Sequence, residues 1–204
     1  MRLCIGEGAK WYFEESVMPR PTADSVAFRV KACGICGSDI PRIFSGKSYF
    51  YPIVLGHEFA GEVADSDDSA LIGKRACVFP ILPCGKCAFC EREEWANCVQ
   101  YDYYGSRRDG GMQDYLLIKK ENLIFLPDAV SDAAASMIEP TAVCLHAVKK
   151  ADIQKGDTVT VYGAGTIGLL CAMWARAFGA KQVFISDIDQ TRLSCISSTK
   201  ETNM

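Results

Sequence analysis

The sequence of 204 residues contains only two histidines, lacks an excess of basic charge and lacks an apolar leader. Lys and Arg total 22 against 25 Asp and Glu, so the formal net charge is −3. This balance argues against a protein whose affinity comes from neutralising nucleic-acid phosphates. The first seven residues contain no hydrophobic stretch of signal-peptide length. We therefore expect a cytoplasmic location and no nucleic-acid partner.

The sequence also lacks internal repeats, low-complexity tracts and a convincing membrane span. Residues 158–175 carry no charged side chain, and this run approaches the ~20 residues that a transmembrane helix needs. Three glycines interrupt the run, and the β-branched residues before them give way to a different composition afterwards. A strand, a turn and a helix explain this pattern better than a membrane span does.

The first part of the chain has the pattern of short β-strands. Residues 25–31, 59–63, 75–79 and 112–118 are strand-like, and the first of these segments alternates at period two. Glycine and proline occur in the gaps between them, where turns are expected. These features predict a compact β-rich domain.

Helical character begins after Pro127. Ser131 is a plausible N-cap for a short helix, and a second helix is expected from Pro140 to Val148. His146 lies on that second helix, and we expect it to be a packing residue rather than a ligand.

A strand–helix–strand unit follows the second helix. Residues 158–162 predict a strand buried on both faces, residues 169–178 a helix that closes at Gly179, and residues 183–186 a second strand. This order indicates one βαβ unit, the opening of a parallel sheet. Residues 194–204 are polar, with no apolar period and no further strand expected.

The eleven cysteines are distributed unevenly. An odd number in a chain without a secretion signal does not suggest a disulfide framework. Close spacing of four thiolates favours a tetrahedral zinc site, which is structural because it leaves no open position. A zinc ribbon that binds nucleic acid is the rival, but acidic side chains outnumber basic ones in this lobe, residues 83–99. The four cysteines are Cys84, Cys87, Cys90 and Cys98.

A second set of metal-binding residue types is dispersed along the chain. Cys36, His57 and Glu139 together form a thiolate, imidazole and carboxylate set that could hold zinc and leave room for water or a substrate oxygen. Ser38 is placed to pass a proton, and Asp39 could orient the histidine as a hydrogen-bond acceptor. Each residue alone is a weak signal, because most such side chains lie in a core or on a surface.

A glycine-rich turn follows the strand at 158–162. It begins a helix and precedes Asp187 at the end of the next strand, as in a dinucleotide-binding fingerprint. The glycines would allow a tight turn, approach of the pyrophosphate and close helix packing, while the helix N-terminus favours the anion. Asp187 could accept hydrogen bonds from both ribose hydroxyls, which favours NAD over NADP. The candidate contact residues of the turn are Gly163, Gly165, Thr166, Ile167 and Gly168.

These three motifs, in this order, resemble the zinc-containing medium-chain alcohol and polyol dehydrogenases over nearly the whole chain, to about Leu193. Segments 38–44, 55–59 and 105–111 are most similar to the galactitol-1-phosphate 5-dehydrogenase branch. The resemblance implies an α/β fold. Residues 1–150 would form a GroES-like zinc-binding catalytic domain, and residues 151–204 the N-terminal part of a Rossmann NAD-binding domain.

The resemblance also implies zinc-dependent, NAD-linked oxidation of a secondary alcohol in a polyol or polyol phosphate, with two zinc ions per chain. Cys36, His57 and Glu139 would bind the catalytic zinc, with Glu58 as an alternate ligand, and which glutamate binds directly stays open. Ser38 would belong to the proton relay. Three basic residues are candidates for the substrate phosphate, with simple surface solvation as the alternative: Arg42, Arg107 and Arg108.

Members of this family extend well beyond residue 204, and only two of their six Rossmann strands are expected here. We therefore expect a C-terminally truncated chain with impaired or absent turnover, derived from an enzyme that forms homo-oligomers. The alternative function is a non-catalytic zinc-binding scaffold or interaction protein that retains the dehydrogenase fold.

Overall fold

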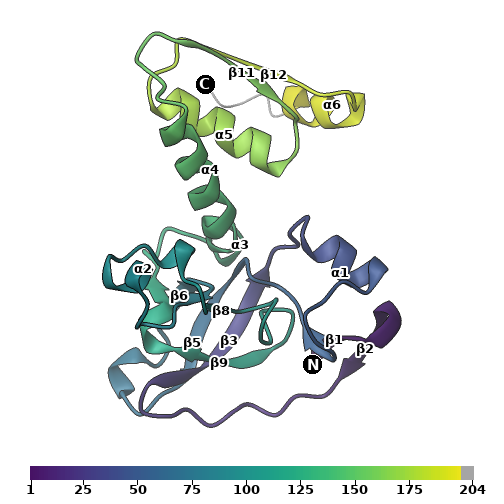
Figure 1. The fold of residues 1–204 in the computed structure, drawn as a ribbon, viewed down its shortest axis with the longest axis vertical. Coiled ribbons are helices and arrows are strands. Elements are labelled where there is room, and N and C mark those ends of the chain that lie inside the picture. Colours follow the sequence, from purple (N-terminus) through teal and green to yellow (C-terminus); the bar gives the residue numbers. More distant parts are fainter. Residues whose placement is uncertain (199–204) are drawn as a thin grey trace. The chain divides into compact units, whose positions relative to one another are not determined.

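The β-strands of the first part of the chain form the largest sheet among the described residues (Figure 1). The computed structural model describes residues 1–198. Five antiparallel strands pair in the order β10-β6-β5-β3-β9. Their bounds are β3 (Ser25–Cys33), β5 (Phe59–Asp65), β6 (Arg75–Val78), β9 (Tyr115–Lys119) and β10 (Leu123–Phe125). The four expected strands correspond to β3, β5, β6 and β9, with boundaries shifted by a few residues.

The register of β3 and β5 determines which loops meet. Cys33, the last residue of β3, pairs with Phe59, the first residue of β5. The backbone N–H of Gly34 donates to the carbonyl of Glu58 at 2.7 Å, which extends the pairing by one step. Because the two strands are antiparallel, the segment that follows β3 and the segment that precedes β5 lie at the same end of the sheet.

Aromatic and branched side chains fill the core of this sheet. Phe59 contacts Phe28 and Tyr104 edge to face, with ring centroids 6.3 Å and 6.4 Å apart. Val26 and Ile118 are fully buried in the same cluster. Burial of each such side chain contributes roughly 1.5–3 kcal/mol, so the strand ends that carry the site rest on a well-packed base.

A smaller sheet holds the N-terminus. Its strands are β1 (Arg2–Gly6), β2 (Lys10–Glu14) and β4 (Ile53–Val54), in the order β2-β1-β4, and a 3₁₀ turn spans Glu7–Ala9. Ile5, Ile53 and Leu55 are buried together. This packing fixes β4 just before Gly56 and His57.

Short helices connect the strands of this part. They are α1 (Asp39–Ser45), α3 (Asp132–Ser136) and the 3₁₀ turns Ser69–Leu71 and Lys120–Asn122. The expected N-cap is confirmed, since the Ser131 side chain accepts from the Ala134 N–H at 3.2 Å. Helix α1 ends at Gly46, whose φ of 62° is easily adopted only by glycine.

A small lobe is inserted between two short paired strands, β7 (Ile81–Leu82) and β8 (Asp102–Tyr103). It contains α2 (Ala88–Glu91) and a 3₁₀ turn at Trp95–Asn97. The Trp95 ring packs against Phe79, with centroids 6.1 Å apart. The hairpin and this aromatic contact attach the lobe to the sheet.

The chain divides into two compact units, residues 1–138 and a second unit that begins at Glu139. Apart from the first residue of α4, the second unit contains α4 (Ile138–Lys150), β11 (Thr158–Tyr162), α5 (Thr166–Ala177), β12 (Gln182–Ser186) and α6 (Gln190–Ser198). Strands β11 and β12 are parallel, with α5 between them in the chain. Helix α5 contacts both strands. The sequence places the division at 150, whereas α4 belongs with the second unit.

Two expectations for the second unit are wrong. Strand β11 is not buried on both faces: alternate residues are exposed, and Tyr162 is 86% exposed, which is the pattern of a strand with one covered face. His146 is exposed on α4 and does not pack. The expectation for residues 194–204 is not contradicted: α6 continues as far as Ser198 and no strand follows β12 in the described residues, while the rest of that segment lies outside them.

The uncharged run at 158–175 forms β11, a glycine turn and most of α5, as expected. In the described part of the chain, every helix is too short or too polar to cross a membrane.

Candidate functional site

A tight turn after β3 presents Cys36. The Asp39 N–H donates to the Cys36 carbonyl at 2.9 Å, and the Cys36 N–H donates to Asp39 Oδ2 at 3.0 Å. The Ser38 N–H points to the Cys36 sulfur at 3.5 Å. These reciprocal bonds form where α1 begins, so the helix start fixes the thiol.

His57 and Glu58 enter the same place from the chain before β5. Both are buried, at 6% and 7% exposed. A Cβ on Gly34 would lie 2.3 Å from Glu58 Oε2, so only glycine leaves room for this carboxylate beside the end of β3. The His57 ring also contacts the Tyr103 ring edge to face at 5.6 Å. The space at Gly34 thus accommodates the carboxylate of Glu58, and the ring of Tyr103 restrains the imidazole of His57.

Cys36, His57 and Glu58 form the first candidate metal centre. One ligand atom from each lies within 4.8 Å of the others. Burial raises the pKa of the Glu58 carboxyl, a hydrogen bond with Cys36 opposes this rise, and the charge of Asp39 adds to it. Buried carboxylates of this kind are stabilised in their charged form by a nearby cation. The donor types and their spacing therefore fit a zinc ion.

Asp39 and Arg42 lie behind this group. Asp39 is fully buried, and its Oδ1 lies 3.8 Å from His57 Nδ1 and 3.6 Å from Arg42 Nη1. Arg42 also donates from Nη1 to the Ser38 carbonyl at 2.7 Å and to Ser38 Oγ at 3.0 Å. Burial raises the pKa of Asp39, and the neighbouring His57 partly offsets this rise. Arg42 thus ties the exposed Ser38 hydroxyl to the buried carboxylate.

The four lobe cysteines form the second candidate metal centre. Their sulfurs lie within 4.8 Å of one another, with separations of 3.9 Å for Cys84–Cys90, 3.5 Å for Cys87–Cys90 and 4.0 Å for Cys87–Cys98. Four sulfurs at ~2.3 Å from a central zinc would be ~3.8 Å apart, whereas a disulfide requires ~2.05 Å. The lobe therefore has the dimensions of a tetrathiolate zinc site.

Backbone amides prepare two of these thiols for the thiolate form. The N–H of Val99, followed by that of Cys90, lowers the pKa of Cys87 to about 6. The Cys84 N–H donates to the Cys98 sulfur at 3.2 Å and lowers the pKa of Cys98. Burial and neighbouring thiols raise the pKa of Cys90 to about 11, so its ionisation is expected to depend on a bound cation.

The glycine turn between β11 and α5 provides the candidate dinucleotide site. Gly163 has a φ of +107°, and a Cβ on Gly168 would lie 1.8 Å from the Gly163 carbonyl oxygen. Gly165 has no atom within 4 Å of its Cβ position and precedes Thr166, the first residue of α5. Gly163 and Gly168 are thus required by the fold, while the open space at Gly165 fits an approaching pyrophosphate.

Asp187, just after β12, is tied to this turn. Its Oδ2 accepts from the Ala164 N–H at 2.7 Å, and its Oδ1 accepts from the Asp189 N–H at 2.8 Å. These two backbone bonds lower the pKa of Asp187, and Arg192 contributes further. Each carboxylate oxygen can accept more than one hydrogen bond, so capacity for ribose hydroxyls remains.

Glu139 lies in the second compact unit, unlike Cys36, His57 and Glu58. Its role as a zinc ligand therefore stays a prediction. Sequence reasoning missed the roles of Arg42 on Ser38 and of Tyr103 on His57. Ser38 and Arg42 are four residues apart at the start of a helix, and this spacing could have predicted their contact. No local sequence pattern predicts the contact of Tyr103 with His57.

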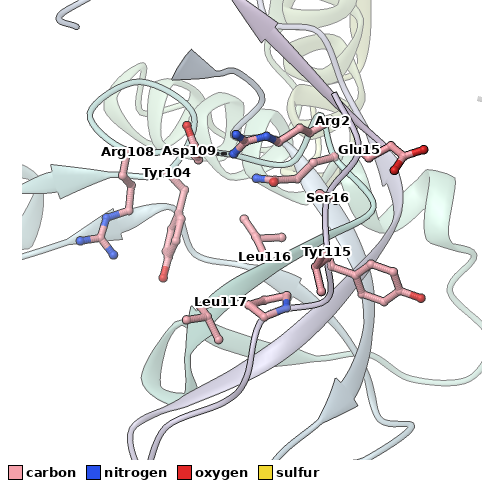
Figure 2. A pocket seen from close by; sticks show the side chains of 12 residues that line it. Arg2, Glu15, Ser16, Tyr104, Arg108, Asp109, Tyr115, Leu116 and Leu117 are labelled. Carbon is pink, nitrogen blue, oxygen red and sulfur yellow. Dashed lines mark ion pairs between the residues drawn. The ribbon is translucent and has the colours of Figure 1, made fainter. Parts of the chain in front are cut away.

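A groove of about 470 Å³ lies elsewhere in the first unit, between the segment after β2 and strand β9 (Figure 2). Arg2 and Arg108 line it, and Figure 2 marks the ion pair of Arg2 with Asp109. None of the candidate metal ligands lines this groove. The metal centres are therefore separate from it.

Comparison with known proteins identifies relatives over most of the chain. The model of the alcohol dehydrogenase GroES-like domain matches residues 22–128. Galactitol 1-phosphate 5-dehydrogenase of Escherichia coli K12 is 40% identical over 188 residues, which cover 90% of this chain and 54% of that protein. The chain spans about half the length of the curated relatives it matches.

Solved structures agree with this relationship. Galactitol-1-phosphate dehydrogenase from Escherichia coli superposes with a TM-score of 0.88 at 37% identity, covering 97% of this chain and 58% of that one. An alcohol dehydrogenase from Escherichia coli CFT073, complexed with NADH, gives a TM-score of 0.88 at 32% identity, covering 98% and 60%. The expected fold, a GroES-like domain followed by a parallel βαβ unit, is confirmed. Because the GroES-like model covers more than half of the residues, the chain belongs to the zinc-type medium-chain alcohol and polyol dehydrogenases.

Proposed function

We propose that the chain carries the zinc-binding and dinucleotide-binding parts of an enzyme that oxidises a secondary alcohol of a polyol or polyol phosphate to a ketose. The convergence of Cys36, His57 and Glu58 ligand atoms within 4.8 Å carries this proposal. Thiolate, imidazole and carboxylate ligands with a position left open are typical of catalytic zinc. The names of relatives, galactitol 1-phosphate 5-dehydrogenase and sorbitol dehydrogenase, suggest the substrate class.

The residues of the chain would divide the chemistry among them. Cys36 and His57 would hold zinc together with Glu58 or Glu139, and the bound ion supplies Lewis-acid polarisation of the substrate hydroxyl. Ser38 is exposed and would carry the hydroxyl proton toward solvent. Arg42 fixes the Ser38 hydroxyl by its 3.0 Å hydrogen bond.

Asp39 would position two ligands at once. Its Oδ2 accepts the Cys36 N–H, and its Oδ1 faces His57 Nδ1 at 3.8 Å. A carboxylate beside one ring nitrogen favours the proton on that nitrogen and leaves the other nitrogen available to a metal. The second zinc, in the four-cysteine lobe, would be structural.

NAD would bind at the glycine turn of the second unit. The space at Gly165 and the amino end of the twelve-residue helix α5 suit a pyrophosphate. Asp187 would accept from the ribose hydroxyls and repel a 2′-phosphate, so NAD is favoured over NADP. Hydride would then pass from the substrate carbon to the nicotinamide.

The proposal is tested with the zinc-loaded chain, NADH and galactitol 1-phosphate. We expect fluorescence titration to detect NADH binding, and NADH formation from NAD and galactitol 1-phosphate to be slow or absent. The variant His57→Ala should lose one equivalent of zinc and any turnover while its NADH affinity stays unchanged. A chain that binds one chelation-resistant zinc, no second zinc and no NADH would contradict the proposal and favour a non-catalytic scaffold.

A further inference from the structure

The guanidinium of Arg107 lies over two tyrosine rings. Its central carbon lies 4.6 Å from the Tyr49 ring centroid and 4.4 Å from that of Tyr101. Its Nη2 also donates to the Tyr101 hydroxyl at 3.5 Å. Stacking of this kind orients the planar cation while leaving its edge donors available.

The backbone beneath Arg107 is equally constrained. The carbonyl of Tyr103 accepts from three successive N–H groups, those of Ser106, Arg107 and Arg108, at 3.0–3.3 Å. Gly105 makes the turn with a φ of +78°. A cation fixed by both its backbone and its side chain loses little conformational entropy when it binds an anion.

Arg107 also differs from its neighbours in its charge partners. Arg42 pairs with Asp39, and Arg108 pairs with Asp102 at 2.6 Å. Within residues 1–198, no carboxylate forms an ion pair with Arg107. Its neighbour Arg108, which pairs with Asp102, lines the separate groove of Figure 2. Arg107 therefore offers an uncompensated positive charge.

A chain of ring contacts connects this charge to the first candidate metal centre. Tyr101 contacts Tyr103 edge to face at 6.3 Å, and Tyr103 contacts the His57 ring at 5.6 Å. All of these residues belong to the first compact unit. Two ring contacts therefore separate the imidazole of the metal centre from the tyrosine that stacks on Arg107.

We propose that Arg107, clamped by Tyr49 and Tyr101, binds the phosphate group of a polyol phosphate whose reacting hydroxyl lies at the Cys36–His57–Glu58 group. This inference rests on the proposed function and narrows its substrate class from polyols to phosphorylated polyols. The fork of donors on a guanidinium matches two phosphate oxygens, which a point-charge ammonium does not do. Tyr49 is 65% exposed, so the clamp is open to a ligand.

The test is calorimetric titration of the zinc-loaded 204-residue chain with galactitol 1-phosphate, galactitol and inorganic phosphate as separate probes. The variants are Arg107→Gln, which removes the charge, and Arg107→Lys, which keeps the charge but not the fork. Arg29→Gln is the matched control, because Arg29 is also an exposed arginine over a tyrosine ring, 5.7 Å from the centroid of Tyr115, and it belongs to no ring chain to His57. Thermal unfolding of each variant shows whether it is folded.

The wild-type chain should bind galactitol 1-phosphate about 10- to 100-fold more tightly than galactitol, the range expected for charge-assisted hydrogen bonds. Arg107→Gln should abolish this difference and leave galactitol binding unchanged. Arg107→Lys should retain part of the difference, and Arg29→Gln all of it.

Four results would overturn the inference. Equal binding of galactitol 1-phosphate by wild type and Arg107→Gln would remove Arg107 from the site. Inorganic phosphate bound as tightly as galactitol 1-phosphate would indicate a general anion site rather than a substrate subsite. Failure of the zinc-loaded chain to bind either polyol would overturn the proposed function as well, whereas equal binding of both polyols would overturn this inference alone.

Discussion

Asp39 Oδ1 lies 3.8 Å from His57 Nδ1, and neither atom has a hydrogen-bond partner within residues 1–198, although both are buried. The other oxygen of the same carboxylate accepts the N–H of Cys36 at 3.0 Å. One buried acid therefore restrains the backbone of one candidate ligand and faces the ring of another. A buried carboxylate without a full set of hydrogen bonds lowers the stability of the fold. Its position beside both candidate ligands therefore points to a role in orienting them toward a metal.

Asp39→Asn should lower zinc affinity at the Cys36–His57–Glu58 group by about 10- to 100-fold, because the neutral amide no longer favours the metal-binding orientation of the imidazole. The zinc of the four-cysteine lobe should be retained. Competition with a chromophoric chelator measures both sites, and Asp152→Asn, at an exposed aspartate of the second unit, is the matched control. The metal-free variant should keep its thermal stability, since the asparagine oxygen can still accept the Cys36 N–H. Unchanged zinc affinity in Asp39→Asn would refute this role.

Two alanine substitutions separate the glycines that the fold needs from the one that the ligand needs. Gly168→Ala should destabilise the second unit by roughly 1–3 kcal/mol, because its Cβ would lie 1.8 Å from the Gly163 carbonyl. This sign is opposite to the usual stabilising effect of alanine in a helix. Gly165→Ala should unfold like wild type, since nothing lies within 4 Å of its Cβ.

Gly165→Ala should nevertheless weaken NADH binding, because the methyl group would occupy the space proposed for the pyrophosphate. Thermal unfolding by circular dichroism and NADH fluorescence titration provide the two readouts. An unchanged NADH affinity in a folded Gly165→Ala variant would place the dinucleotide elsewhere.

Cys98→Ala should remove one zinc equivalent and destabilise the lobe, because three thiolates cannot complete the tetrahedron. Cys171→Ala, which removes a half-buried cysteine from the second unit, should retain both equivalents. Metal analysis after dialysis measures the stoichiometry, and limited proteolysis around residues 83–99 reports lobe unfolding. Loss of zinc from both variants, or from neither, would argue against the lobe as a dedicated site.

The pH dependence of the second unit should reflect Asp187. The Ala164 and Asp189 N–H groups lower the pKa of Asp187 in the folded chain, so its stabilising effect is complete above the ordinary aspartate pKa of ~3.9. That effect is lost as the pH falls through the lowered folded-state value. The Trp174 indole, which donates to the Thr141 carbonyl at 3.0 Å, gives an NMR reporter of this unit.

Asp187→Asn should therefore reduce the acid sensitivity of unfolding at the Trp174 reporter, while its stability at neutral pH should be lower than that of wild type. Identical acid profiles for the two proteins would show that Asp187 contributes no linkage.

Sequence periodicity predicted the main strands and the βαβ unit because their alternation and turn residues are local signals. The close spacing of the four lobe cysteines in the chain likewise predicted that they lie together. The meeting of Cys36 with His57 depends on the register in which Cys33 pairs with Phe59. No local pattern encodes that register, so this site was predicted only from its residue types and from family resemblance.

The side chains around the site were harder to predict for the same reason. Tyr103 contacts His57 from β8, the strand that follows the four-cysteine lobe, and the contacts of Arg107 with Tyr49 and Tyr101 join segments more than fifty residues apart in sequence. The prediction that both faces of β11 are buried was wrong. Apolar composition shows that a strand is suited to burial, but it does not show whether other elements cover both of its faces.

Zinc stoichiometry of the wild-type chain and of Cys36→Ala tests the central claim most directly. If Cys36, His57 and Glu58 belong to an open zinc site, wild type should contain two zinc ions per chain and Cys36→Ala one, with the remaining ion lost only on disruption of the four-cysteine lobe. A wild-type chain that binds a single zinc, or a Cys36→Ala variant that retains two, would contradict the account.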